Sequence, residues 1–291
     1  MSSTSSGNMV RSVLSLFLLM ILLLLTAGET EANEAPTASI DSVTPNPAYQ
    51  NIPNSFSLLD NTTVGYWSFD EGDGNITRDG TVHRNDGSLI NGPNWVSGKL
   101  GYAVSLDSSE NQYIVIQDER SLDITNWTVS AWIYPHSDYE DSSAEIVYRA
   151  PDGHATYQLE YRYNEKRVNV WFETANDNDY YIFSSDNSVP FNQWSLVTGS
   201  YNGTILALYL NGELIDTDDV SVSPHTGQAT LQFGHGDSGY FDGVIDEMAI
   251  WNRALTDREV EQLFLASSER LATFNGSASD DDGTITNYLW S

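Results

Sequence analysis

The sequence contains no cysteine and very little positive charge. Without cysteine the chain has no disulfide framework, no thiolate nucleophile and no thiolate ligand for zinc. Lys99 and Lys166 are the only two lysines, and 12 Lys and Arg residues face 41 Asp and Glu residues, which gives a net charge of -29. A surface this acidic repels nucleic acid and anionic lipid but suits cations, so we predict no nucleic-acid partner.

The sequence also lacks the common motifs of hydrolases. It has no HExxH and no GxSxG, and its Gly-rich stretches lack the strand-to-helix setting of a phosphate-binding loop. The histidines are scattered over predicted turns: His83, His136, His154, His225 and His235. We therefore predict that the chain is not an enzyme.

An N-terminal apolar run indicates export. The run SVLSLFLLMILLLLTAG follows Arg11 and gives way to small and acidic residues, including Glu29 and Ala32. It is shorter than the about 20 residues of a spanning helix, so we predict a signal peptide over 1–32 and a secreted or cell-surface protein. An uncleaved membrane anchor is the alternative, and it would be the chain's only membrane contact. The Asn-x-Ser/Thr triplets are compatible with export.

The middle of the chain alternates apolar and polar residues in short runs. Typical runs are WTVSAWIYP (127–135), AEIVYR (144–149), YQLEYRY (157–163) and RVNVWFE (167–173), each bounded by Gly, Asn, Asp or Pro. Strand follows strand without a long helix between, which predicts an all-β fold of two antiparallel sheets.

Local signals predict two hairpins and one short helix. The Asn-Gly pairs at 202–203 and 211–212 favour tight type I′ turns. In LTDREVEQLF (255–264), Thr256 and Glu259 have the spacing of a capping box, which predicts a helix that closes the domain.

An ordered set of motifs resembles a known family. VGYWSFDEGDGN, DGTVHRNDGSL, GKLGYAVSLD, WTVSAWIYP, FNQWSLVTGSYNG and FDGVIDEMAIWNRALTDREVEQLF follow one another as in laminin-G-like, concanavalin-A-like jelly rolls. The resemblance covers about residues 60–265 and implies a two-sheet jelly-roll sandwich that binds glycans or proteins outside the cell.

The flanks resemble a different family. NEAPTASIDSVTPNPA (33–48) and ATFNGSASDDDGTITNYLWS (272–291) are similar to the opening strands of a PKD domain, an immunoglobulin-like sandwich of surface proteins. We therefore expect a PKD-like segment and linker over 33–59, a jelly roll over 60–266 and a partial PKD-like segment over 267–291. The half-domain would need more chain, or a partner, to bury its face.

The jelly roll implies a structural calcium ion. Its first and last strands commonly lie side by side, which would bring Asp70 near Asp246, and two close carboxylates favour a cation between them. Calcium prefers such oxygen ligands. The segment DGTVHRNDG aligns with a ligand-bearing loop of the family, which adds Asp79 and Asn85. The alternative is that these acidic residues only form turns.

Two loops have the composition of a sugar-binding surface. NDNDYY (176–181) and HGDSGYFDG (235–243) combine aromatic rings with acids and amides, and we select Tyr180, Tyr181, Asp179 and Tyr240. The alternative is that these tyrosines pack inward.

The predicted function is a non-catalytic binding module for an extracellular glycan or glycoprotein. The alternatives are an adhesive spacer of a larger surface protein and an accessory domain of an extracellular hydrolase. The Glu-x-Asp-x-x-Glu strand of glycosidases with this fold is absent.

Overall fold

A computed structural model describes residues 38–42, 59–117, 120–136, 143–268 and 275–278. The chain divides into two units: Tyr49–Arg270, and the two flanks Met1–Ala48 and Leu271–Ser291. The predicted signal peptide lies outside the described residues, as do most positions of the PKD-like segments. Their assignment stays a prediction.

In the flanking unit, one strand from each end of the chain forms a pair. β1 (Ala38–Ser42) runs antiparallel to β18 (Asn275–Ala278), with Ala38 opposite Ala278 and Ser39 opposite Ser277. The two flanks therefore meet in one antiparallel strand pair.

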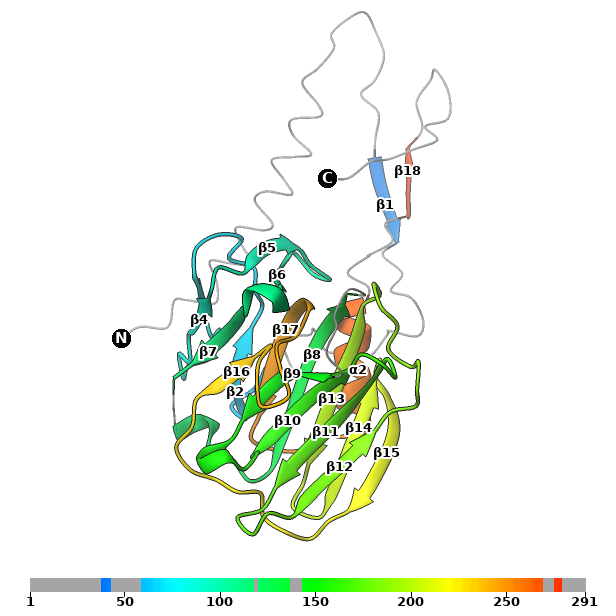
Figure 1. Ribbon diagram of the computed structural model, residues 1–291. Helices are drawn as coiled ribbons and strands as arrows, with labels where there is room; N and C mark the ends of the chain where they lie inside the picture. Colours follow the sequence, from blue (N-terminus) through cyan, green and yellow to red (C-terminus); the bar gives the residue numbers. More distant parts are fainter. Residues whose placement is uncertain (1–37, 43–58, 118–119, 137–142, 269–274, 279–291) are drawn as a thin grey trace, which may run out of the picture. The chain divides into compact units, whose positions relative to one another are not determined.

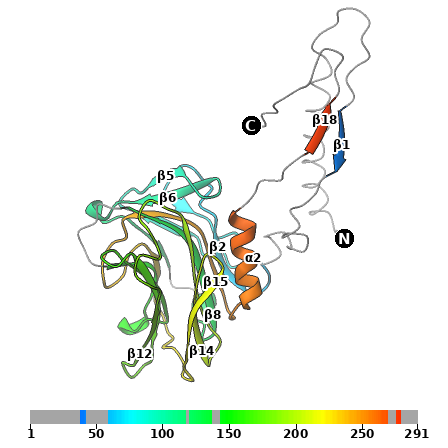
Figure 2. The ribbon, with the colours of Figure 1, turned by 90° about the vertical axis from the view of Figure 1, so that its right-hand side faces the viewer.

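The larger unit is a sandwich of two antiparallel sheets (Figures 1 and 2). The sheet that we call the front sheet contains, in spatial order, β12 (Asp179–Phe183), β11 (Arg167–Glu173), β10 (Tyr157–Arg162), β9 (Ser143–Arg149), β16 (Leu231–Phe233), β7 (Tyr113–Ile116), β4 (Gly87–Ile90) and β3 (Ile76–Thr77). The back sheet contains β15 (Glu213–Asp219), β14 (Ile205–Leu210), β13 (Ser195–Tyr201), β8 (Trp127–Pro135), β17 (Gly243–Trp251), β6 (Tyr102–Leu106) and β5 (Asn94–Ser97). β2 (Thr63–Trp67) also pairs with β17, so the first strand of the unit does lie beside the last. The predicted two-sheet jelly roll is confirmed.

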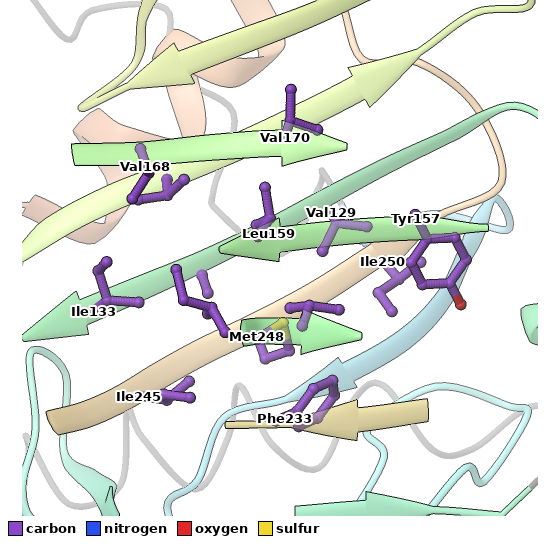
Figure 3. Packing of buried hydrophobic residues seen from close by; sticks show 14 of the residues in the cluster. Val129, Ile133, Tyr157, Leu159, Val168, Val170, Phe233, Ile245, Met248 and Ile250 are labelled. Carbon is purple, nitrogen blue, oxygen red and sulfur yellow. The ribbon is translucent and has the colours of Figure 1, made fainter. Parts of the chain in front are cut away.

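The core lies between the sheets (Figure 3). In most strands alternate residues point inward, so that Leu159 of the front sheet faces the same interior as Val129 of the back sheet. Trp67 meets Phe233 edge to face, with ring centroids 4.9 Å apart. Each fully buried side chain of this size contributes about 1.5–3 kcal/mol, so the core is the main source of stability.

The helix α2 (Asp257–Ser268) covers the outer side of the back sheet (Figure 2). Its capping box is confirmed, because Thr256 Oγ1 accepts from the Glu259 N–H at 3.3 Å and Glu259 Oε2 accepts from the Thr256 N–H at 2.8 Å. Leu255 and Val260 are buried against the sheet. No helix among the described residues is long and apolar enough to cross a membrane.

The two Asn-Gly pairs make hairpins of different geometry. Asn211 and Gly212 have φ angles of 52° and 83°, as the predicted type I′ turn requires. At the other hairpin only Gly203 has a positive φ, of 95°, while Asn202 Oδ1 accepts from the Thr204 N–H at 2.9 Å. The type I′ prediction is wrong for this turn, because the Asn side chain closes a longer loop.

Candidate functional site

The two carboxylates predicted to share calcium both contact the turn between β5 and β6. Asp70 Oδ1 accepts a hydrogen bond from the Tyr102 N–H at 2.9 Å, and Asp246 Oδ2 accepts one from the Leu100 N–H at 3.0 Å. A Cβ added at Gly101 would lie 1.9 Å from Asp70 Oδ1, so glycine is required for this approach. The fold therefore brings both carboxylates to one turn.

Asp246 is the more constrained of the two. Its side chain is buried, and burial, with a further contribution from the charge of Glu247, raises its pKa to about 8. A cation beside it would offset this cost. Within the described ranges no three His, Asp or Glu side chains group closely enough to hold a metal. A calcium ion at Asp70 and Asp246 would therefore take its remaining oxygens from backbone and water.

Asp79 and Asn85, the other two predicted ligands, are held by the protein itself. Asp79 Oδ1 accepts from the N–H groups of Tyr66 at 3.0 Å and Thr81 at 2.8 Å. Its Oδ2 accepts from the Thr81 hydroxyl at 2.7 Å and the Asn85 N–H at 2.9 Å. Asn85 Nδ2 donates to the Val64 carbonyl at 2.7 Å. Because these bonds use the acceptor positions of the Asp79 carboxylate, the two residues fit a role in ordering the loop better than a metal site.

The predicted ligand residues of β12 divide between its two faces. Tyr181, which is 52% exposed, and Asp179 point outward, and Tyr181 lies opposite Trp171 of β11. Tyr180 points inward and stacks on Phe172, with ring centroids 5.3 Å apart. Tyr180 is therefore a core residue, because neighbouring residues of a strand face opposite sides.

Tyr240 belongs to a second aromatic group, in the loop 234–240 between β16 and β17. Its ring stacks on His235 at 4.2 Å, and Tyr113 of β7 lies 5.0 Å from His235. Burial lowers the pKa of His235 and so favours the neutral imidazole. This group lies on the same side of the front sheet as Tyr181. We call the side formed by the outward-pointing side chains of that sheet its outer face.

Between the two aromatic groups lies a row of polar side chains that the sequence did not reveal. Glu145 of β9, Glu160 of β10 and Asn169 of β11 are opposite one another across three neighbouring strands. We call them the polar row. They alternate with core residues such as Leu159 and so point outward, yet they are only 0%, 1% and 1% exposed. The alternation was visible in the sequence, but the cross-strand register that aligns the three residues was not.

Several buried polar atoms on this face have no partner. Glu145 Oε2, Asn169 Oδ1 and Trp171 Nε1 make no hydrogen bond within the part of the chain that the structure describes. Buried polar atoms are normally hydrogen-bonded. Because these atoms have almost no accessible surface, an enclosed water is the group that can complete them.

The loop 234–240 rests on Glu145. The Ser238 N–H donates to Glu145 Oε1 at 2.8 Å, and the Tyr148 hydroxyl donates to Asp237 Oδ2 at 2.6 Å. A Cβ at Gly236 would lie 2.6 Å from the Glu145 carboxyl carbon, so only glycine allows the loop to approach this closely. The loop thus fixes the position of Tyr240 relative to the polar row.

The two carboxyl groups of the polar row have unequal surroundings. Burial raises the pKa of Glu145, and the neighbouring charge of Glu160 raises it further. Glu160 accepts from Arg162 Nη1 at 3.2 Å and from Asn169 Nδ2 at 3.4 Å. Paired carboxyls also serve glycosidases, but these two are covered in this structure, so they support neighbouring groups and do not face a scissile bond.

A cavity beneath α2 is a poorer candidate for a ligand-binding site. It measures about 60 Å³, lies against the outer side of the back sheet and is lined by residues such as Tyr66, Trp132 and Leu263. It has room for a few waters but none for a sugar ring.

Comparison with known proteins identifies the family. The profile of the laminin-G-type "concanavalin A-like lectin/glucanases superfamily" matches residues 107–261, more than half of the chain. The chain therefore belongs to this superfamily. No match was found among the curated proteins.

Solved structures share the fold at low sequence identity. The chain is similar to domain 4 of AbnA, a GH43 extracellular arabinanase from Geobacillus stearothermophilus, solved in complex with arabinotriose: identity is 20%, the TM-score is 0.56, and the match covers 69% of this chain and 98% of that domain. It is also similar to the binding domain of Paraclostridial Mosquitocidal Protein 1, with 21% identity, a TM-score of 0.60 and coverage of 70% and 52%. It is similar, too, to the binding domain of Botulinum Neurotoxin DC in complex with SialylT. There the identity is 14%, the TM-score is 0.59, and the match covers 71% of this chain and 52% of that domain. The chain spans about half the length of the two toxin domains, and the likeness establishes the fold.

Proposed function

We propose that the chain is a non-catalytic module that binds carbohydrate on an extracellular glycan or glycoprotein, through the outer face of the front sheet. The observation that carries this proposal is the combination of exposed and half-buried aromatic rings with accessible polar side chains, such as that of Asp179, on one face. Tyr181 and Trp171 form one aromatic group and Tyr240 and His235 the other, with the polar row between them.

This combination matches the chemistry of sugars. A pyranose ring has an apolar face that stacks on aromatic side chains, and its hydroxyls exchange hydrogen bonds with acids, amides and indole N–H groups. Similar structures support the proposal, since one was solved with arabinotriose and another with SialylT.

A glycan array tests the proposal. The full chain should bind a defined set of glycans saturably, and Trp171→Ala should lose that binding while keeping the melting temperature within a few degrees. Tyr102→Ala is the control, because this tyrosine is 50% exposed but lies on the back sheet. Silence of the full chain on the array would favour the adhesive-spacer function instead.

Two further parts of the proposal come from the sequence. The N-terminal apolar run supports secretion or display at the cell surface. A structural calcium ion would be held by Asp70 and Asp246 and would tie the first and last strands to the β5–β6 turn. Calcium would supply the positive charge that the buried Asp246 lacks.

A further inference from the structure

We infer that β15, the edge strand of the back sheet, binds an extended segment of a partner protein as an added strand, and that basic and apolar residues alternate in this segment. The site is separate from the proposed sugar-binding face, because β15 belongs to the other sheet. Its free backbone edge, the direction of its side chains and its charge carry the inference.

The first feature is the position of β15 in the back sheet. Among the described residues it pairs with β14 and with no other strand, and it lies at the margin of the sandwich (Figure 1). Each of its seven residues is exposed. The strand therefore keeps one free edge, along which its backbone can pair with a further strand.

Hydrogen bonds show which backbone groups lie at this free edge. Directly after β15, the Val220 N–H donates to the Thr204 carbonyl at 2.7 Å, so residue 220 faces the β14 side. Facing and outward residues alternate along an antiparallel ladder, so the N–H and C=O groups of Thr217 and Asp219 point away from β14. The Thr217 N–H donates instead to Oδ1 of Asp216 at 2.9 Å. A carbonyl of an added strand can take the place of that side chain.

The second feature is the direction of the side chains. Asp216 lies opposite Leu208 and Asp218 lies opposite Leu206, and both leucines belong to the core. Residues directly opposite each other point to the same side, so both aspartates point to the inner side of the sheet and Thr217 points to the other side. An added strand therefore meets carboxylates on one of its sides and uncharged groups on the other.

The third feature is charge. The strand has four carboxylates in seven residues, on Glu213, Asp216, Asp218 and Asp219. No Lys, Arg or His of the described ranges forms an ion pair with them. Lys or Arg at every second position of an added strand would face Asp216 and Asp218, and opposite charges across two strands attract.

Two exposed apolar side chains complete the surface. Leu214 and Ile215 are 45% and 38% exposed, and the register with β14 shifts at Ile215. Apolar residues between the basic ones of an added strand can cover Leu214. A second copy of β15 is a poor occupant, because four carboxylates would then face four others. Charge complementarity therefore favours a basic segment of another protein.

Binding of labelled synthetic peptides to the full chain, measured by fluorescence polarisation, tests the inference. The probe is a peptide of about ten residues in which Lys and Val alternate. One control peptide alternates Glu and Val, and the other has the composition of the probe with all Lys before all Val. The probe should bind saturably and about tenfold more tightly than either control. Its affinity should fall as NaCl is raised, because salt screens exposed charges.

Variants of β15 make the test specific. Thr217→Pro removes an N–H that the pairing with β14 does not use, so it should weaken binding about threefold to tenfold and change the melting temperature little. The double variant Asp216→Asn/Asp218→Asn should weaken binding by a similar factor and reduce its salt dependence. Glu110→Gln, an exposed position outside β15, is the control and should bind as the original chain does.

Three results would overturn the inference. The block peptide could bind as tightly as the alternating one, which would show attraction by net charge alone. Binding could persist in both β15 variants, which would place the peptide elsewhere on the surface. The alternating peptide could fail to bind at all, and the acids of β15 would then serve only to keep other strands away from this edge.

Discussion

Glu145 and Glu160 lie directly opposite each other on β9 and β10, and both carboxyl groups are buried on the outward side of the front sheet. Two buried negative charges this close are costly, so the pair favours a proton on one member. Burial and the charge of Glu160 raise the pKa of Glu145, and the Glu160 carboxylate bonds to Arg162. The protonation of this pair therefore links the stability of the fold to pH.

Glu145→Gln should make the protein less sensitive to alkaline pH. The pKa of Glu145 is higher in the folded protein than in the unfolded chain, where it is about 4.5. The bound proton therefore stabilises the fold fully below pH 4.5, and this stabilisation is lost as pH rises. The Gln variant should therefore gain free energy of unfolding over the original chain at pH 8, on the order of 1 kcal/mol, and differ less at pH 5. Denaturant unfolding at both pH values measures this. The exposed Glu110→Gln is the control, and a gain of equal size at both pH values would contradict the account.

Calcium should raise the melting temperature more at pH 8 than at pH 5. Asp246 has a pKa of about 8 without a cation, so between pH 4 and 8 the folded state holds a proton that the unfolded chain has released, and stability falls as pH rises. A cation binds the ionised carboxylate and reverses this loss. Asp246→Asn should abolish the calcium response. Asp79→Asn should lower the melting temperature and keep the response. Melting curves that coincide in calcium and in chelator at pH 8 would rule out the site.

Gly101→Ala should destabilise the β5–β6 turn by about 2–3 kcal/mol, because a Cβ there combines a positive φ with a clash against Asp70. Gly92→Ala is the matched control: its φ is +72°, but no atom lies within 4 Å, so about 1 kcal/mol is expected. The double variant Asp70→Ala/Gly101→Ala should recover part of the loss. Additive effects in a double-mutant cycle of the two sites would show that Asp70 does not contact the turn.

Glu259→Gln should weaken the start of α2 at neutral pH but not at pH 2. Hydrogen bonds from Arg253 lower the pKa of Glu259 to about 2, so its stabilisation is present above pH 4.5 and disappears as pH falls towards 2. Thr256→Ala removes the other half of the capping box and should cost about 1 kcal/mol. Unfolding free energies across this pH range provide the check. Glu261→Gln, on an exposed position of the same helix, should show no such dependence.

Local chemistry made much of the fold predictable. The alternating runs gave the strands, and the spacing of Thr256 and Glu259 gave the start of the helix. The pairing of β2 with β17 followed from the family resemblance. These features depend on residues close in sequence or on a shared topology.

The candidate site was less predictable, because it depends on register. Tyr180 and Tyr181 differ by one position, and that step decides between core and surface. A shift in the pairing of β9 with β10, between Leu159 and Glu160, places Glu160 opposite Glu145. Sequence alone does not reveal such an irregularity, nor the four hydrogen bonds that occupy Asp79.

The most direct test of the central claim is a calorimetric comparison of the full chain, Trp171→Ala and Tyr102→Ala, each titrated with neutral hexasaccharides. We expect saturable binding by the full chain and by Tyr102→Ala, and an affinity lower by about tenfold or more in Trp171→Ala. Equal binding by all three proteins would contradict the claim that the outer face of the front sheet holds the sugar.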